Sequence, residues 1–173
     1  RRRDVPGGGR MAVQVAVCGP AAATPDERAA ARRVGELLAE RGAVVICGGG
    51  AGVMAAVAAG ARSRGGTVVG VRPGATDDGA APDLSVTIRT NLGEARNAVI
   101  VSSADAVIAV GGSWGTLSEV ALAMRRGDVP VITLGGWRVL ADDGTPVPGV
   151  HRVATAEEAV TRALAGPAPG QAG

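Results

Sequence analysis

Apolar residues in this chain occur in short uninterrupted runs, and the stretches between them carry apolar residues at helical spacing. Runs of this kind, rich in Val, Ile and Ala and bounded by Gly, Pro or Asp, predict buried β-strands. We expect strands at residues 13–17, 43–47, 67–71, 86–88, 106–110 and 129–134.

The stretches between the runs predict helices with recognisable starts. Thr24, Pro25 and Glu27 predict a capping threonine, a proline in the first turn and a glutamate that completes a capping box. The last helix should begin in the same way at Thr155, with Glu158 at its third position. Asn91 and Glu94, Thr116 and Glu119 suggest further caps.

Strands that alternate with helices predict an α/β fold: a Rossmann-like, doubly wound, mostly parallel sheet with helices on both faces. A chain of 173 residues suits a single domain. We place that domain at residues 11–165, between tails at 1–10 and 166–173 whose Gly, Pro, Arg and Ala content predicts disorder. The loop at residues 73–82 is rich in Gly, Asp and Ala and could serve as a flap, and residues 135–149 are rich in turns.

Composition excludes several classes of function. The chain has no lysine, so it cannot form a pyridoxal phosphate Schiff base or a Walker A loop. The formal net charge is only +2 and tryptophan is the only aromatic residue type, which argues against nucleic acid as a partner. The single histidine, His151, is expected in a loop, and we predict no metal site and no cofactor. Cys18 and Cys47 are read as buried thiols of a reducing, cytoplasmic compartment, and no segment is long enough to span a membrane.

Two glycine-rich turns lie where a predicted strand passes into a predicted helix, at residues 48–52 and 111–115. Glycine allows a positive φ and a close approach to a ligand, and a helix N-terminus attracts anions. In a parallel sheet, both turns would lie at the carboxyl ends of the strands, where ligands bind. They predict a cleft for a phosphate-bearing molecule.

Glu119 has two interpretations at this stage. Its spacing from Thr116 is that of a capping box, in which both side chains satisfy backbone N–H groups. Alternatively, it is a catalytic carboxylate beside the phosphate site. The spacing alone favours neither interpretation, but the presence of a second glycine turn favours the catalytic one.

The order of four segments along the chain resembles that in the Lonely guy family of cytokinin-activating phosphoribohydrolases. These segments are Cys18-Gly19, residues 48–54, Glu94 to Asn97 and residues 111–119. The resemblance covers most of residues 13–134 and is strongest to a bacterial branch that is similar to molybdenum cofactor carrier proteins. The family motif Pro-Gly-Gly-x-Gly-Thr-x-x-Glu corresponds to residues 111–119. Gly111 replaces the proline of the motif, and Ser113 replaces its second glycine. The family's Arg-Lys pair appears as Arg96 and Asn97.

The resemblance implies hydrolysis of the N-glycosidic bond of a nucleoside 5′-monophosphate, such as AMP or a cytokinin riboside monophosphate, to the free base and ribose 5-phosphate. Arg96 and Glu119 are then the expected catalytic residues. Substrate and phosphate binding is expected at Cys18, Gly19, Gly49, Gly50, Gly52, Asn97, Gly112, Ser113, Trp114, Gly115 and Thr116. Since the Arg96 guanidinium is always cationic, it should also hold Glu119 ionised if the two lie close together.

Two other functions stay open. Gly50, Gly52 and Ala55 satisfy a loose dinucleotide-binding pattern, but Arg72 stands where the acidic residue is expected. The stronger rival is a molybdenum cofactor carrier or nucleotide sensor that uses the same turns without turnover. We also expect a homodimer, formed through a helix face that carries Leu117, Val120, Ala121 and Met124.

Overall fold

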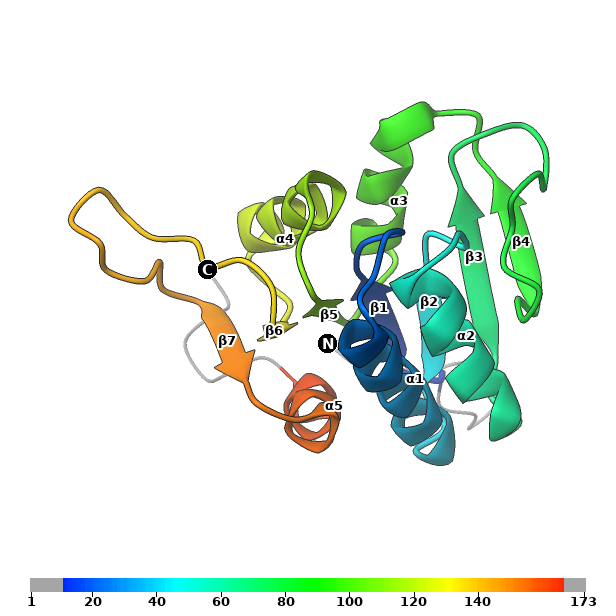
Figure 1. Ribbon diagram of the computed structural model, residues 1–173, viewed down its shortest axis with the longest axis horizontal. Helices are drawn as coiled ribbons and strands as arrows, with labels where there is room; N and C mark the ends of the chain where they lie inside the picture. The colour runs from blue at the N-terminus through cyan, green and yellow to red at the C-terminus, as the bar shows by residue number, and fades with distance from the viewer. Residues whose placement is uncertain (1–10, 167–173) are drawn as a thin grey trace.

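The computed structural model describes residues 11–166 and has one seven-stranded sheet in which every strand is parallel to its neighbours (Figure 1). The strand order is β4-β3-β2-β1-β5-β6-β7. The strands are β1 (Gln14–Cys18), β2 (Val44–Cys47), β3 (Val68–Arg72), β4 (Val86–Arg89), β5 (Ala106–Val110), β6 (Val131–Leu134) and β7 (Val150–Val153). The predicted tails at 1–10 and 167–173 lie outside the described residues.

Helices cover both faces of the sheet, as the alternating pattern predicted (Figure 1). One face carries α1 (Pro25–Glu40), α2 (Val53–Ser63) and α5 (Ala156–Leu164). The other carries α3 (Arg96–Ser102), which follows the short 3-10 helix η1 (Gly93–Ala95), and α4 (Trp114–Arg126). The doubly wound α/β fold is therefore confirmed.

The buried core on both faces is built mainly of Val, Ala and Ile, so backbones can approach closely. Two glycines show how closely α1 and α2 pack. A Cβ atom on Gly60 would lie 2.0 Å from the carbonyl oxygen of Arg32, and one on Gly35 would lie 2.2 Å from that of Val57. Any side chain at either position would push the two helices apart.

The helix starts at Thr24 and Thr155 are confirmed. The Thr24 side chain accepts a hydrogen bond from the Glu27 N–H, and the Glu27 carboxylate accepts one from the Thr24 N–H. Thr155 accepts a hydrogen bond from the Glu158 N–H. These starts could be predicted because each depends on residues three apart in the chain.

Two local predictions were wrong. Asn91 does not cap a helix: it has a φ of 52°, and η1 begins after Leu92 without a side-chain cap. His151 does not lie in a loop, because it belongs to β7, the edge strand paired with β6. The sequence of β7 places His and Arg between two valines, so it lacks the apolar run that marked the other buried strands.

Candidate functional site

The site lies where the sheet changes its direction of winding. β1 and β5 are neighbours, but β1 leads into α1 on one face and β5 leads into α4 on the other. Such a switch point opens a crevice at the carboxyl ends of the two strands. The turn after β1 and the end of β5 approach closely there, since a Cβ atom on Gly19 would lie 2.5 Å from the carbonyl oxygen of Val110.

The turn after β5 has the features of an anion-binding helix N-terminus. Gly111 has a φ of 74°, and the Ser113 side chain caps α4 by accepting a hydrogen bond from the Thr116 N–H at 3.2 Å. Among residues 11–166, the N–H groups of Gly112 and Gly115 have no hydrogen-bond acceptor. Free N–H groups at the positive end of a helix dipole suit a phosphate.

The cap at Ser113 decides between the two interpretations of Glu119. Since Thr116 already lies inside α4, the predicted capping box of Thr116 and Glu119 is wrong. Glu119 lies in the second turn of the helix and is only 8% exposed. Its carboxyl group is therefore not needed by the helix end and is free to serve the crevice.

The environment of Glu119 raises its pKa to about 7, because burial disfavours the charged carboxylate. A hydrogen bond from the Cys18 thiol and the positive charge of Arg96 act in the opposite direction, and neither restores the ordinary value. Arg96 thus lowers the pKa of Glu119 as expected, but not far enough to hold the carboxyl group ionised at neutral pH. The reason is that desolvation outweighs the attraction between the two groups. Burial, more than the neighbouring carboxylate, also raises the pKa of the Cys18 thiol well above its usual value.

Arg96 is held in the crevice by the backbone of two strand ends. Its Nη1 donates to the carbonyl oxygens of Gly48 at 2.8 Å and of Val71 at 2.6 Å, just after β2 and within β3. Its Nε donates to the Asn97 side chain at 2.9 Å. Its Nη2 has no partner among the described residues, so it can bind a ligand.

Asn97 connects Arg96 to the turn that begins α4. Its side-chain oxygen accepts from Arg96, and its Nδ2 donates to Ser118 Oγ at 2.9 Å. Ser118 Oγ in turn donates to the carbonyl oxygen of Gly115 at 2.7 Å. Both polar atoms of the buried Asn97 amide are thus bonded to protein, which suits a positioning residue better than a direct phosphate ligand.

The other glycine turn, at residues 48–52, closes one end of the crevice. Gly49 and Gly52 have φ values of 68° and 65°, and Gly52 is the N-cap of α2. The space beside Gly48 is filled by Met54 and Arg96, because a Cβ atom there would lie 3.0 Å from the Arg96 Nη1. Part of this turn therefore makes room for the arginine, in addition to any contact with a ligand.

The loop at 73–82 is attached to the same turn. The Ala81 N–H donates to the carbonyl oxygen of Gly49 at 2.8 Å, and Arg72 donates to the carbonyl oxygen of Asp78 at 2.8 Å. Arg72 thus stands at the end of β3, as the sequence predicted, and joins the loop to the crevice.

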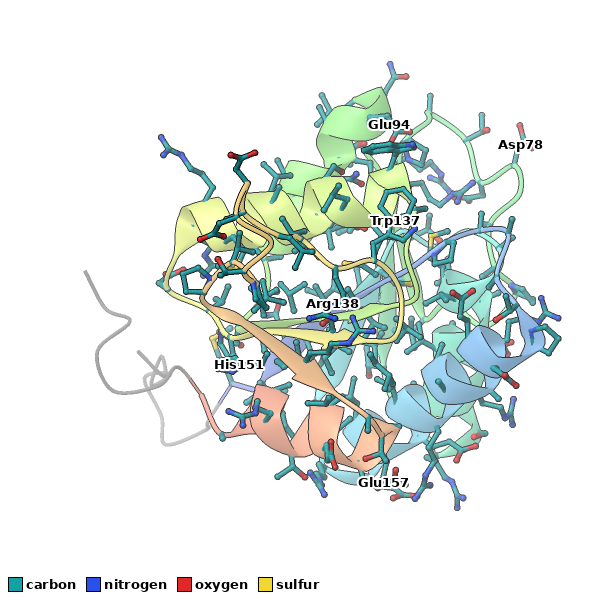
Figure 2. The ribbon with its side chains drawn as sticks, turned by 60° about the vertical axis from the view of Figure 1, so that its left-hand side comes forward. Asp78, Glu94, Trp137, Arg138, His151 and Glu157 are labelled. Carbon is teal, nitrogen blue, oxygen red and sulfur yellow. The ribbon has the colours of Figure 1, made fainter. Side chains whose placement is uncertain are left out.

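Two tryptophans lie at the opposite end of the site. Trp114 opens α4 and is 78% exposed, and Trp137 packs edge-on against it with ring centroids 4.9 Å apart. Figure 2 shows Trp137 at the start of α4 and Arg138 below it, between α4 and β7. Sequence reasoning did not include Trp137 in the site, because the turn-rich segment 135–149 carries no periodic pattern.

Neither a metal site nor a membrane span is found in the described part of the chain. Residues 11–166 contain no group of three or more His, Cys, Asp or Glu side chains able to hold a metal ion. In the same residues, no helix is long and apolar enough to cross a bilayer.

Known proteins resemble this chain over most of its length. The model of the SLOG cluster4 family matches residues 12–160. An uncharacterised protein from Archaeoglobus fulgidus is 43% identical over 133 residues, which are 73% of this chain and 87% of the relative.

Two solved structures have similar folds and identities of about one third. The molybdenum cofactor binding protein of Rippkaea orientalis has a TM-score of 0.78 and 32% identity, covering 87% of this chain and 94% of the other. The Moco carrier protein of Chlamydomonas reinhardtii has a TM-score of 0.76 and 30% identity, covering 90% and 99%.

Proposed function

Because this chain belongs to the SLOG cluster4 family, we propose that its crevice binds a nucleoside 5′-monophosphate and hydrolyses its N-glycosidic bond. The observation that carries this proposal is Glu119: a buried carboxyl group at the switch point, with a pKa of about 7. A carboxyl group with such a pKa can accept or donate a proton near neutral pH. Perturbed groups of this kind in a crevice are typical of catalytic sites.

The N-terminus of α4 binds the 5′-phosphate through the N–H groups of Gly112 and Gly115. Binding there fixes the ribose near Glu119 and turns binding energy into orientation. The free Nη2 of Arg96 binds a phosphate oxygen or a ribose hydroxyl. Trp114, exposed beside the turn, offers an apolar surface to the base.

In the reaction, a water oxygen forms a bond to C1′ as the bond from C1′ to the base nitrogen breaks. Glu119 in its ionised form accepts a proton from the attacking water and stabilises the positive charge that develops at C1′. The base takes up one proton as it leaves. The products are the free base and ribose 5-phosphate, and no other reactant is consumed.

The direct test is incubation of the purified protein with AMP, followed by measurement of free adenine. We expect release from AMP and little release from adenosine, which lacks the group that the α4 N-terminus binds. Equal cleavage of AMP and adenosine would contradict the phosphate site. If no purine or pyrimidine monophosphate releases its free base, the hydrolase proposal is contradicted.

The second candidate is a carrier of molybdenum cofactor, which the Rippkaea and Chlamydomonas structures favour by their similarity over most of the chain. The cargo would be a pterin that carries a phosphate, and the same helix N-terminus and Arg96 suit such a group. A pterin that copurifies with the protein, together with no turnover of nucleotides, would favour this candidate. The two functions share the anion site and differ in whether Glu119 is needed.

We also propose that the protein forms a homodimer, on a different surface from the one the sequence suggested. Val120 is buried against the sheet, Leu117 lines a cavity and Met124 packs against the core, so most of the predicted stripe faces inward. The exposed apolar surface between α3 and α4 keeps Ala121 of the predicted stripe and adds Ala98 and Leu122. A twofold axis would bring this surface against its own copy.

A further inference from the structure

A cavity of about 160 Å³ lies on the α4 side of β5 and β6, and Gly111, Gly112 and Ser113 of the anion-binding turn form part of its wall. We call residues 135–149, which connect β6 to β7, the arm. Leu140 and Pro146 form an antiparallel bridge in it, and the Ala141 N–H donates to the Thr145 carbonyl oxygen at 2.8 Å. Figure 1 shows the arm projecting away from the sheet, and its base closes the cavity.

Most of the cavity wall is apolar. Val120 of α4, Val139 and Val147 of the arm and Val150 of β7 contribute to it, together with the ring of Trp137. The arm is therefore not an isolated loop, because its apolar side chains form one side of this space, which stays open to solvent where Trp137 and Val139 are 46% and 42% exposed. That space suits an apolar body better than a cluster of water molecules.

Three polar side chains in the wall have no partner among the described residues. The cavity is lined by Thr133 of β6, Arg138 of the arm and Arg152 of β7. None of these three side chains forms a hydrogen bond or an ion pair with another residue in the range 11–166. Thr133 is only 8% exposed. Both arginines are exposed to solvent, and each guanidinium group can bind a carboxylate through two N–H groups.

The cavity adjoins the crevice at the anion-binding turn but does not extend to Glu119. Thr116, Leu117 and Val120 of α4 face the cavity, whereas Glu119 faces Cys18. On an α-helix, these two directions lie about 100° apart. Neither Glu119 nor Arg96 lines the cavity.

We propose that this cavity is a second binding site, for a single-ring aromatic carboxylate held by Arg138 and Arg152. Its volume supports the size of the ligand, since an apolar cavity of about 150 Å³ accommodates one benzene ring. The ring lies against Trp137 and the valines, the carboxylate bridges the two arginines, and Thr133 offers a hydroxyl group to the ligand.

Benzoate is the probe, and benzamide is its neutral counterpart of the same shape. The chain has only two tryptophans, and one of them lines the cavity, so tryptophan fluorescence reports occupancy. We expect benzoate to change the fluorescence in a saturable way and to raise the melting temperature. Benzamide should bind at least about tenfold more weakly, which corresponds to about 1.4 kcal/mol. Absence of benzoate binding by both measurements, or equal binding of benzamide, would overturn the proposal.

Variants locate the site. Arg138→Gln combined with Arg152→Gln should weaken benzoate binding at least about tenfold, whereas Arg125→Gln, an exposed arginine on the far side of α4, should leave it unchanged. Glu119→Gln should bind benzoate as the natural protein does, so the result does not depend on hydrolase activity. Unchanged binding in the double variant, with an unchanged melting temperature showing that it folds, would overturn the assignment.

Discussion

Replacing Glu119 by glutamine tests how the fold and the proposed chemistry depend on one buried carboxyl group. The pKa of Glu119 rises from 4.5 to about 7 on folding, so the fold favours its neutral form. That rise corresponds to about 3 kcal/mol of unfolding free energy. The favourable contribution is complete below pH 4.5, decreases as the pH rises, and is lost above about pH 7.

Glutamine is neutral at every pH and has nearly the same shape, so the variant should lack this pH dependence. At pH 5, the two proteins should melt at similar temperatures. At pH 8, the variant should be more stable by about 3 kcal/mol, or about 6 to 12 °C in melting temperature for a domain of this size. AMP hydrolysis, in contrast, should fall by a factor of about 10² to 10³.

The assay is thermal unfolding at both pH values, with Glu94→Gln as the matched control. Glu94 is an exposed glutamate of η1 whose charge raises the pKa of Glu119 far less than burial does, so its replacement should change the melting temperature little at pH 5 and only slightly at pH 8. A difference between natural protein and Glu119→Gln that is the same at pH 5 and pH 8 would refute the account of the buried carboxyl group. Full activity in the glutamine variant would remove Glu119 from the mechanism.

Three further outcomes are expected. Arg96→Ala should raise the KM for AMP. Because a positive charge near Glu119 is lost, it should also raise the pKa of Glu119 further, which a pH profile of activity measures; an unchanged profile would contradict the coupling between Arg96 and Glu119. Asn97→Ala should lower the unfolding free energy by about 1 to 3 kcal/mol, since the Arg96 Nε and Ser118 lose their partner, and denaturant unfolding measures it. Leu122→Arg should convert a dimer to a monomer in light scattering at micromolar concentration, and a mass unaffected by the change would place the interface elsewhere.

Much of the fold could be predicted because its signals are local. The apolar runs of β1, β2, β3, β5 and β6 and the caps at Thr24 and Thr155 depend on neighbours within one turn or one strand. β7 could not be predicted in this way, since its pairing with β6 is supplied by the sheet and its own sequence places His and Arg between two valines. The arm and its cavity were missed for the same reason.

The sequence by itself determined the type of fold, the two glycine turns and the presence of Arg96 and Glu119 near them. Only the tertiary structure decided what those two residues do. Glu119 and Thr116 have the spacing of a capping box, but Ser113 is the cap of α4, and burial beside Cys18 raises the pKa of the Glu119 carboxyl group. Arg96 reaches carbonyl oxygens 48 and 25 residues away in the chain. Contacts of that range depend on how the strands are ordered in the sheet, and spacing along the chain does not encode that order.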